Sequence, residues 1–360
     1  MIISEKSKQH IDSCRFCWMC HHICPIGNAT GLERNTARAR ALGLSLVNRG
    51  AIELSECIDN VYECATCGAC HHDCTTGWDP VMFTKEVRLQ AALEGALPEY
   101  IQKLVMNCLE KGNAYGAEGV SAELEAKIKE HSAKTETLLV LGADARYMAP
   151  CFAKNAMIAL KKAGVKFTVL DKEIDSGIAL DTLIGAMEET KEAMQACADV
   201  LNKYKTVIVL DPQDMKVFVR EYKEWGIDLK CEIKTYTSVL ASLVNEGKIE
   251  VAKVSGKLTY QDNPLLVREV GETEEGRVVC KAAGEYVEMI LSGKDTMFAG
   301  NFIMAQWMDN VMKLVAKERM ANIIQSGANA VVCASPADYT FLKEAAPENI
   351  AVIDISELVI

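Results

Sequence analysis

The sequence predicts two structural parts, a mostly helical, cysteine-rich N-terminal module and a duplicated α/β domain with two lobes. Three observations lead to this prediction. Nine of the fifteen cysteines lie within the first 74 of 360 residues. From Thr137 onward, short β-branched or aliphatic runs alternate with helical stretches, which is typical of parallel sheets covered by helices. Similar segments then recur a little over 120 residues apart within this second part.

Composition excludes several classes of protein. Charged residues make up 25% and hydrophobic residues 49% of the chain, an ordinary globular balance. The net charge of −11 argues against a general nucleic-acid binder. Residues 1–12 are too polar for a signal peptide, and no apolar run approaches the ~18 residues of a membrane span. We therefore expect a cytoplasmic protein without membrane insertion, in which clustered cysteines serve as metal ligands.

The clustered cysteines form two runs with the same spacing, Cys14-x2-Cys17-x2-Cys20-x3-Cys24 and Cys64-x2-Cys67-x2-Cys70-x3-Cys74. In ferredoxin-like modules with this spacing, the fourth cysteine of each run ligates the other cluster. The expected ligand sets are Cys14, Cys17, Cys20 and Cys74 for a first 4Fe–4S cluster, and Cys64, Cys67, Cys70 and Cys24 for a second. Two structural zinc sites are the alternative, but zinc prefers paired Cys-x2–4-Cys halves.

The sequence predicts less specific roles for several residues near the two runs. Cys57 lies outside both runs and is expected to pack as a buried thiol. His21-His22 and His71-His72 follow corresponding cysteines, so their side chains are expected to pack or hydrogen-bond near the clusters. Donation to cluster sulfurs is the alternative. Gly68 is expected to allow a close approach of the backbone to a cluster.

The N-terminal region is basic, unlike the rest of the chain. Residues 1–50 carry three acidic side chains and seven basic ones, Lys6, Lys8, Arg15, Arg34, Arg38, Arg40 and Arg49. Cations close to anionic thiolate clusters would stabilise the clusters and raise their reduction potentials. The same charges would also attract an acidic partner. For Arg38 and Arg40, on a helix expected over Thr36–Gly50, a solvated helix face is the alternative.

Capping residues and periodicity place the later elements. Asp79-Pro80 and Leu97-Pro98 each begin a helix, and Ser121–His131 forms a charged helical connector. The expected strands are Leu138–Leu141, Lys166–Leu170, Thr206–Leu210, Lys257–Tyr260, Tyr286–Ile290, Ala330–Cys333 and Ala351–Ile353. The expected helices between them are Cys151–Lys162, Leu180–Tyr204 and Ala305–Gln325. These elements suggest a module over 1–112, a linker over 113–135 and an α/β domain over 136–360, with repeats at about 136–245 and 256–360.

Taken together, these motifs resemble the iron–sulfur subunits of the heterodisulfide reductase and anaerobic glycerol-3-phosphate dehydrogenase families. In those families a helical two-cluster module precedes a duplicated cysteine-rich domain, the CCG domain. Each repeat there carries a Cys-Cys-Gly signature and a Cys-Pro-x-Cys element that bind a further cluster. The resemblance is specific over residues 14–80 and moderate over 137–360.

The second part of this chain departs from that pattern at the ligand positions. Other residues occupy them: Asp175-Ser176-Gly177, Phe298-Ala299-Gly300, Asp211-Pro212-Gln213-Asp214, Ser335-Pro336-Ala337-Asp338 and Thr259-Tyr260-Gln261-Asp262-Asn263-Pro264. Oxygen donors suit an iron–sulfur cluster poorly, so the third cluster is expected to be absent. The scattered thiols Cys108, Cys151, Cys197, Cys231, Cys280 and Cys333 are expected to be structural. Helix capping or surface exposure is expected of the aspartates, and a hard-cation site between the lobes is the alternative.

The resemblance implies an electron-transfer subunit that relays single electrons through two 4Fe–4S clusters. A flavin-containing dehydrogenase or reductase would be its partner in a hetero-oligomeric complex. No Gly-x-Gly-x-x-Gly follows an expected strand, so neither flavin nor NAD is expected on this chain. With no catalytic residue assigned, the chain is not expected to catalyse a reaction by itself. Two alternatives remain, a catalytic heterodisulfide-reductase-like subunit acting between the lobes and a cluster-dependent redox sensor.

Overall fold

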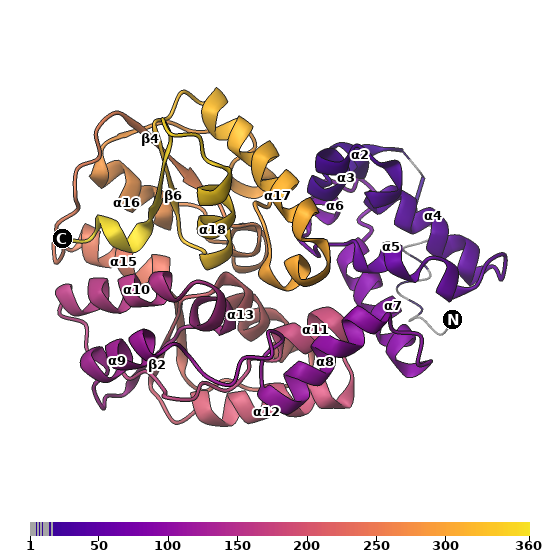
Figure 1. Ribbon diagram of the computed structural model, residues 1–360, viewed down its shortest axis with the longest axis horizontal. Coiled ribbons are helices and arrows are strands. Elements are labelled where there is room, and N and C mark those ends of the chain that lie inside the picture. The colour runs from indigo at the N-terminus through magenta and orange to yellow at the C-terminus, as the bar shows by residue number, and fades with distance from the viewer. Residues whose placement is uncertain (1–4, 6, 8, 10–13, 16) are drawn as a thin grey trace.

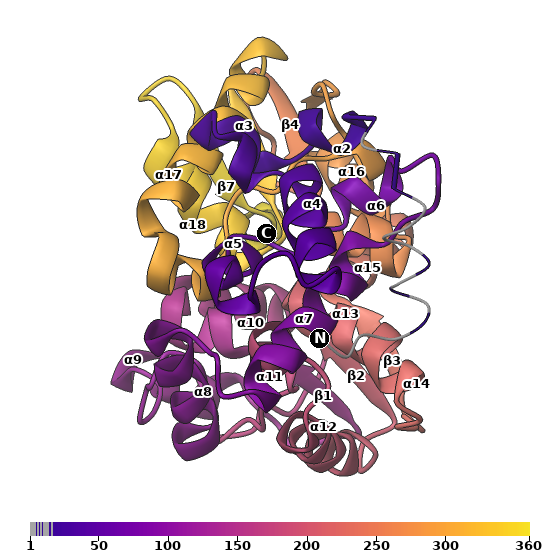
Figure 2. The same ribbon diagram turned by 90° about the vertical axis from the view of Figure 1, so that its right-hand side faces the viewer.

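The computed structural model describes residues 5, 7, 9, 14, 15 and 17–360. Lys6, Lys8 and Asp12, which entered the charge count, lie outside the described residues. A group of helices sits beside two stacked lobes, each with its own small parallel sheet (Figure 1). Seen from the side of these helices, the group lies over both lobes (Figure 2). We call residues 14–112 the cysteine module, 137–245 the first lobe and 257–360 the second lobe.

The described part of the cysteine module contains helices and turns but no strand. Its helices are α2 (Met19–His22), α3 (Pro25–Thr30), α4 (Ala37–Asn48), α5 (Ile58–Tyr62), α6 (Ala69–His72), α7 (Pro80–Leu93) and α8 (Glu99–Lys111). The helix α9 (Ala122–His131) connects the module to the first lobe. Side chains cap the expected helix starts: Asp79 accepts from the amides of Val81 and Met82, and Ser121 accepts from Leu124.

The first lobe is built on a three-stranded parallel sheet in the order β1-β2-β3. The strands are β1 (Thr137–Val140), β2 (Thr206–Val209) and β3 (Glu232–Thr235). Around them lie α10 (Pro150–Lys162), α11 (Ile178–Ile184), α12 (Glu188–Leu201), α13 (Pro212–Lys216), α14 (Tyr222–Glu224) and α15 (Tyr236–Asn245). A single parallel bridge joins Leu138 to Thr168 on the other side of β1.

The second lobe repeats this topology. Its parallel sheet has the order β5-β4-β6-β7 and consists of β4 (Lys257–Gln261), β5 (Glu285–Tyr286), β6 (Ala330–Cys333) and β7 (Ala351–Asp354). Its helices are α16 (Glu275–Ala283), α17 (Phe302–Gln325) and α18 (Pro336–Ala345). A π-helical turn follows the first strand of each lobe, at Asp144–Met148 and Leu266–Val270. The sequence repeat thus corresponds to two copies of one α/β topology.

Three expected elements differ from the structure. The single helix expected over Leu180–Tyr204 is two helices, because Gly185 has φ 63° and separates α11 from α12. A Cβ at Gly185 would lie 2.8 Å from the carbonyl oxygen of Lys85, so close packing also favours glycine there. Lys166–Leu170 forms only the bridge at Thr168, and β5 is confined to Glu285–Tyr286. Strand β3 was not expected at all.

The cysteine module and the first lobe share one hydrophobic core. Leu44 of α4, Phe83 of α7 and Ile101 of α8 pack in the same buried cluster as Leu183 of α11. The buried Tyr62 hydroxyl donates to the carbonyl of Leu183 at 2.7 Å. The module is therefore fixed against the lobes by buried contacts. Among the described residues, no helix has the length and apolar character needed to cross a membrane.

Candidate metal centre

The two cysteine runs adopt the same local backbone. The short helices α2 and α6 each follow a left-handed residue, Trp18 with φ 73° and Gly68 with φ 76°. Glycine adopts this conformation freely, whereas for tryptophan it costs roughly 1–2 kcal/mol. Trp18 is 49% exposed, and the guanidinium of Arg38 stacks 4.0 Å from the centre of its ring. The sequence repeat of these runs is thus also a repeat in structure.

One expected ligand set surrounds a single cavity. Cys24, Cys64, Cys67 and Cys70 line it, together with Arg40 of α4. Cys24 comes from the first run and the other three from the second, which is the crossed arrangement expected from the spacing. Cys24, Cys64 and Cys70 are buried, and Cys67 is partly buried.

The other expected set lies nearer the surface. Cys17 is exposed, while Cys14, Cys20 and Cys74 are partly buried. Burial, with the negative charges of Cys14 and Cys17 nearby, raises the pKa of Cys20 to about 11. Cys74 packs with Cys14 against the core of the cysteine module, and its Sγ lies 3.3 Å from Thr76 Oγ1.

In the buried set, the pKa values of Cys64 and Cys70 are shifted in opposite directions. Burial and the charges of Cys64 and Cys67 raise the pKa of Cys70 well above its ordinary value. Burial also acts to raise the pKa of Cys64, but the guanidiniums of Arg40 and Arg88 outweigh it and lower that pKa. Because a metal binds thiolates rather than thiols, metal binding at this set would release protons.

The distances between the cysteine sulfurs can be compared with those around a single zinc ion. Thiolates at about 2.3 Å from one zinc ion lie about 3.8 Å from one another. Within the described part of the chain, the cysteines supply no group of three sulfurs all within 4.8 Å of one another.

The side chains of His21, His71 and His72 contact oxygen atoms. His21 Nε2 lies 2.8 Å from a carboxylate oxygen of Glu33, and His71 Nδ1 lies 3.1 Å from the carbonyl of Trp78. His72 lies with Asp73 and Asp295 in an exposed group that the sequence did not suggest. These contacts agree with the packing and hydrogen-bonding roles expected for the histidines.

A second candidate site is a carboxylate-lined cavity in the first lobe. Asp144, Asp175, Ser176, Asp211 and Asp214 line it, where loops follow β1 and β2. Asp144 was missed in the sequence, although its place just after a strand was a signal. The side chains of Tyr115 and Gln213 donate hydrogen bonds to the carboxylate of Asp144, and the Ser176 hydroxyl donates to Asp214. Asp211 also caps α13, as expected, by accepting from the amide of Gln213 at 2.9 Å.

The other aspartates of the repeat lie elsewhere in the second lobe. Asp262 is fully buried and pairs with Arg277, while Asp338 is buried and accepts from Asn263 at 2.9 Å. The expectation that Asp338 caps a helix is wrong, because Ser335 occupies the cap position of α18. Surface exposure is also wrong for Asp211, Asp214, Asp262 and Asp338.

Burial changes the protonation of these carboxyls. It raises the pKa of Asp144 and of Asp175 to about 6, and the pKa of Asp338 to about 7. Burial and the charges of neighbouring aspartates raise the pKa of Asp211 and Asp214 well above the ordinary value. Near neutral pH, the loops at the ends of these strands therefore retain carboxyl protons.

This protonation makes stability depend on pH. The folded chain binds the Asp338 proton more tightly than the unfolded chain, so its contribution is complete below about pH 4 and is lost as pH rises through about 7. We expect Asp338→Asn to remove this dependence. Between pH 5 and pH 8, the wild type should lose roughly 2–4 kcal/mol relative to the variant, measured by urea unfolding.

The exposed Asp309 of α17 gives the control for this measurement. Its partner is Lys313 at 2.7 Å, and both side chains are about half exposed. Asp309→Asn should leave the pH dependence of stability as in the wild type. An equal difference between wild type and Asp338→Asn at both pH values would contradict the proposed proton.

A third cavity lies between the lobes and next to the cysteine module. Cys67 lines it with Gln213 of the first lobe and Asn263, Asn301 and Ser335 of the second. The amide of Asn301 donates to Gln213 Oε1 at 3.0 Å and joins the two lobes. Apart from Cys67, the polar side chains that line this cavity are amides and a hydroxyl.

The remaining cysteines are isolated from the two sets. Cys108, Cys197, Cys280 and Cys333 are buried, in keeping with structural thiols. Cys57 and Cys231 are only partly buried and Cys151 is exposed, so none of these three thiols is fully buried. All fifteen cysteines are free of disulfide bonds.

Comparisons with known proteins place the chain among distant relatives. No family model matches it. It is 27% identical over 258 residues to EtfAB:quinone oxidoreductase of Syntrophomonas wolfei, covering 67% of this chain but only 36% of that protein. It is 24% identical to a subunit of the dihydromethanophenazine:CoB--CoM heterodisulfide reductase of Methanosarcina mazei, covering 75% of this chain and 72% of that one.

The corresponding subunit from Methanosarcina barkeri is 24% identical over 97% of this chain and 93% of its own length. These relatives confirm the resemblance to heterodisulfide reductase iron–sulfur subunits. Among solved structures, Picrophilus torridus aspartate racemase covers 61% of this chain at 15% identity and a TM-score of 0.30, too low to support an argument about fold or function.

Proposed function

We propose, from its relation to a heterodisulfide reductase subunit and to EtfAB:quinone oxidoreductase, that this chain is an iron–sulfur electron-transfer subunit of a multisubunit oxidoreductase. One observation carries the proposal: Cys24 joins Cys64, Cys67 and Cys70 around one cavity although it belongs to the other run. Crossed ligation of this kind is characteristic of modules with two clusters.

The proposed ligands are Cys14, Cys17, Cys20 and Cys74 for a first 4Fe–4S cluster, and Cys24, Cys64, Cys67 and Cys70 for a second. A bound cluster supplies a site that accepts and returns one electron at a time. The residues of the chain bury the second site, exclude water from it and place Arg40 beside its thiols. The first site keeps ligands near the surface, with Cys17 exposed.

Because the first site is more exposed than the second, we propose that a partner protein exchanges electrons with this chain there. Trp18, Met19 and Leu32 are large apolar side chains exposed close to the first run, and Arg34 is exposed beside them. An apolar surface with basic residues fits a partner with an acidic rim around its redox group. We propose a flavoprotein as this partner, with the flavin and any nicotinamide bound outside this chain.

The second part of the chain is proposed to act as a scaffold rather than as a catalytic domain. Oxygen side chains replace thiolates in the first lobe, and no cysteine run remains in the second. Because soft thiolates hold iron–sulfur clusters, these positions do not favour a third cluster. Free cysteines throughout the chain suit a reducing compartment, which we propose to be the cytoplasm.

Anoxic purification followed by iron and sulfide analysis tests this function. We expect about eight irons per chain and two paramagnetic signals after reduction, as for two four-iron clusters. Markedly more iron, or reduction of a disulfide by the purified chain alone, would favour the catalytic alternative. Stoichiometric zinc in place of iron would overturn the proposal.

A further inference from the structure

Arg40 is a buried cation whose anionic neighbours are cysteine thiolates. It lies on α4 with 5% of its surface exposed, and its Nη1 donates to the carbonyl of Asn35 at 3.0 Å. Its Nη2 lies 4.0 Å from the Sγ of Cys24. Within the described part of the chain, no carboxylate lies within ion-pair distance of Arg40.

Such burial is costly unless a counter-charge lies close by. An unpaired buried charge strongly destabilises a protein. The charges that stabilise the Arg40 guanidinium are those of Cys64, Cys24 and Cys70. Arg40 is therefore suited to a site that carries negative charge in the working protein.

Two other guanidiniums near this site, the buried Arg88 and the partly buried Arg268, have different partners. Arg88 donates to the carbonyls of Val61, Cys64 and Thr182, at 2.7–3.0 Å. Arg268 of the second lobe donates to the carbonyl of Cys67 at 2.8 Å. These two arginines bond to the backbone of the site, and their charges favour the thiolates of Cys64 and Cys67, whereas the Arg40 side chain reaches a sulfur itself.

A neighbouring arginine of the same helix has different partners. Arg38, two residues before Arg40, pairs with Glu33 at 2.6 Å and stacks on the exposed Trp18. Arg38 therefore serves as a comparison for Arg40.

We propose that Arg40 is an internal counter-ion of the second cluster and raises its reduction potential. This inference rests on the proposed function. Reduction adds one electron, and so one negative charge, to the second site without breaking a bond. A reduced redox partner supplies that electron. A fixed positive charge beside Cys24 stabilises the added charge in a low-dielectric environment.

A redox titration followed by electron paramagnetic resonance tests the inference on the full chain, purified without oxygen and reduced with dithionite. In Arg40→Gln we expect the midpoint potential of the second cluster to shift downward while that of the first stays unchanged. Arg40→Lys keeps the charge and should stay near the wild type. Arg38→Gln, on the same helix, should change neither midpoint by a comparable amount.

Two results would overturn the role of Arg40. One is an unchanged midpoint of the second cluster in Arg40→Gln with full iron content, and the other is an equal shift of both clusters. If Arg40→Gln does not bind the second cluster, Arg40→Lys decides: a wild-type midpoint supports the role of charge, and a lowered one refutes it. A wild type without two four-iron clusters would instead contradict the proposed function itself.

Discussion

Replacing Cys24 with serine should abolish the second cluster and leave the first intact, although Cys24 belongs to the first cysteine run. Its thiol lines the cavity of Cys64, Cys67 and Cys70, whereas Cys17 of its own run is exposed. Serine supplies a hard oxygen donor, which holds an iron–sulfur cluster poorly. Iron content should fall from about eight to about four atoms per chain.

Electron paramagnetic resonance identifies which cluster is lost, because the remaining signal should keep its wild-type line shape. Cys67→Ser should remove the same signal as Cys24→Ser, although the two residues lie in different runs. Cys57→Ser is the matched control: this partly buried thiol lies outside both sets and its Sγ contacts the carbonyl of Leu54. It should keep all the iron. Loss of the first signal in Cys24→Ser would show that each run holds its own cluster.

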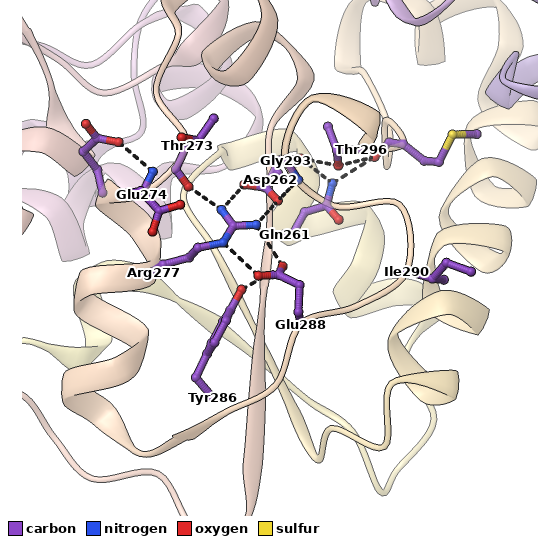
Figure 3. A network of polar contacts seen from close by, with 12 residues as sticks. Gln261, Asp262, Thr273, Glu274, Arg277, Tyr286, Glu288, Ile290, Gly293 and Thr296 are labelled. Atoms are coloured by element: carbon purple, nitrogen blue, oxygen red, sulfur yellow. Dashed lines mark hydrogen bonds and ion pairs between the residues drawn. The ribbon is translucent and has the colours of Figure 1, made fainter. Parts of the chain in front are cut away.

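Replacing Arg277 with methionine should lower the free energy of unfolding by about 3–5 kcal/mol, the cost of leaving one member of a buried ion pair without its partner. Arg277 of α16 donates through both terminal nitrogens to the two oxygens of Asp262, each at 2.7 Å (Figure 3). Asp262 is fully buried, and beyond Arg277 its carboxylate accepts the amide of Gly293 at 2.7 Å. The variant removes the ion-pair partner of this buried carboxylate.

Denaturant unfolding under anoxic conditions, followed by circular dichroism, measures this loss. Lys281→Met is the control on the same helix, because Lys281 and its partner Glu274 are both exposed at 3.8 Å. An exposed pair contributes about 0–1 kcal/mol, so the control should stay close to the wild type. A change below about 1 kcal/mol in Arg277→Met would mean that Asp262 is protonated or finds another partner.

Local sequence signals predicted most of the helices and strands. Asp79 and Ser121 cap their helices because short polar side chains satisfy exposed amides, a rule that needs only neighbouring residues. The break at Gly185 depends on a carbonyl of α7 far away in the chain, so helical periodicity alone did not reveal it. Strand β3 lies at a sheet edge and is only partly buried, which leaves it without a clear hydrophobic pattern.

The candidate sites were predictable to different degrees. The pairing of Cys24 with the second run followed from spacing, since the chemistry of the ligand fixes that spacing. For Arg40 two environments were left open, near a cluster or on a solvated helix face, because a sequence cannot distinguish an arginine facing solvent from one facing a thiol site; its burial rules out the solvated face. The carboxylate group of Asp144, Asp175 and Asp214 arises where loops after two parallel strands meet, which only the tertiary structure specifies.

The core shared by the cysteine module and the first lobe has a consequence for unfolding. Tyr62 and Arg88 of the module donate to the carbonyls of Leu183 and Thr182 in α11, and Trp307 of α17 donates back to the carbonyl of Tyr62 at 3.3 Å. Melting of either part would expose apolar surface of the other. The module and the lobes should therefore denature as one cooperative unit, and loss of cluster absorbance should coincide with loss of helix on heating.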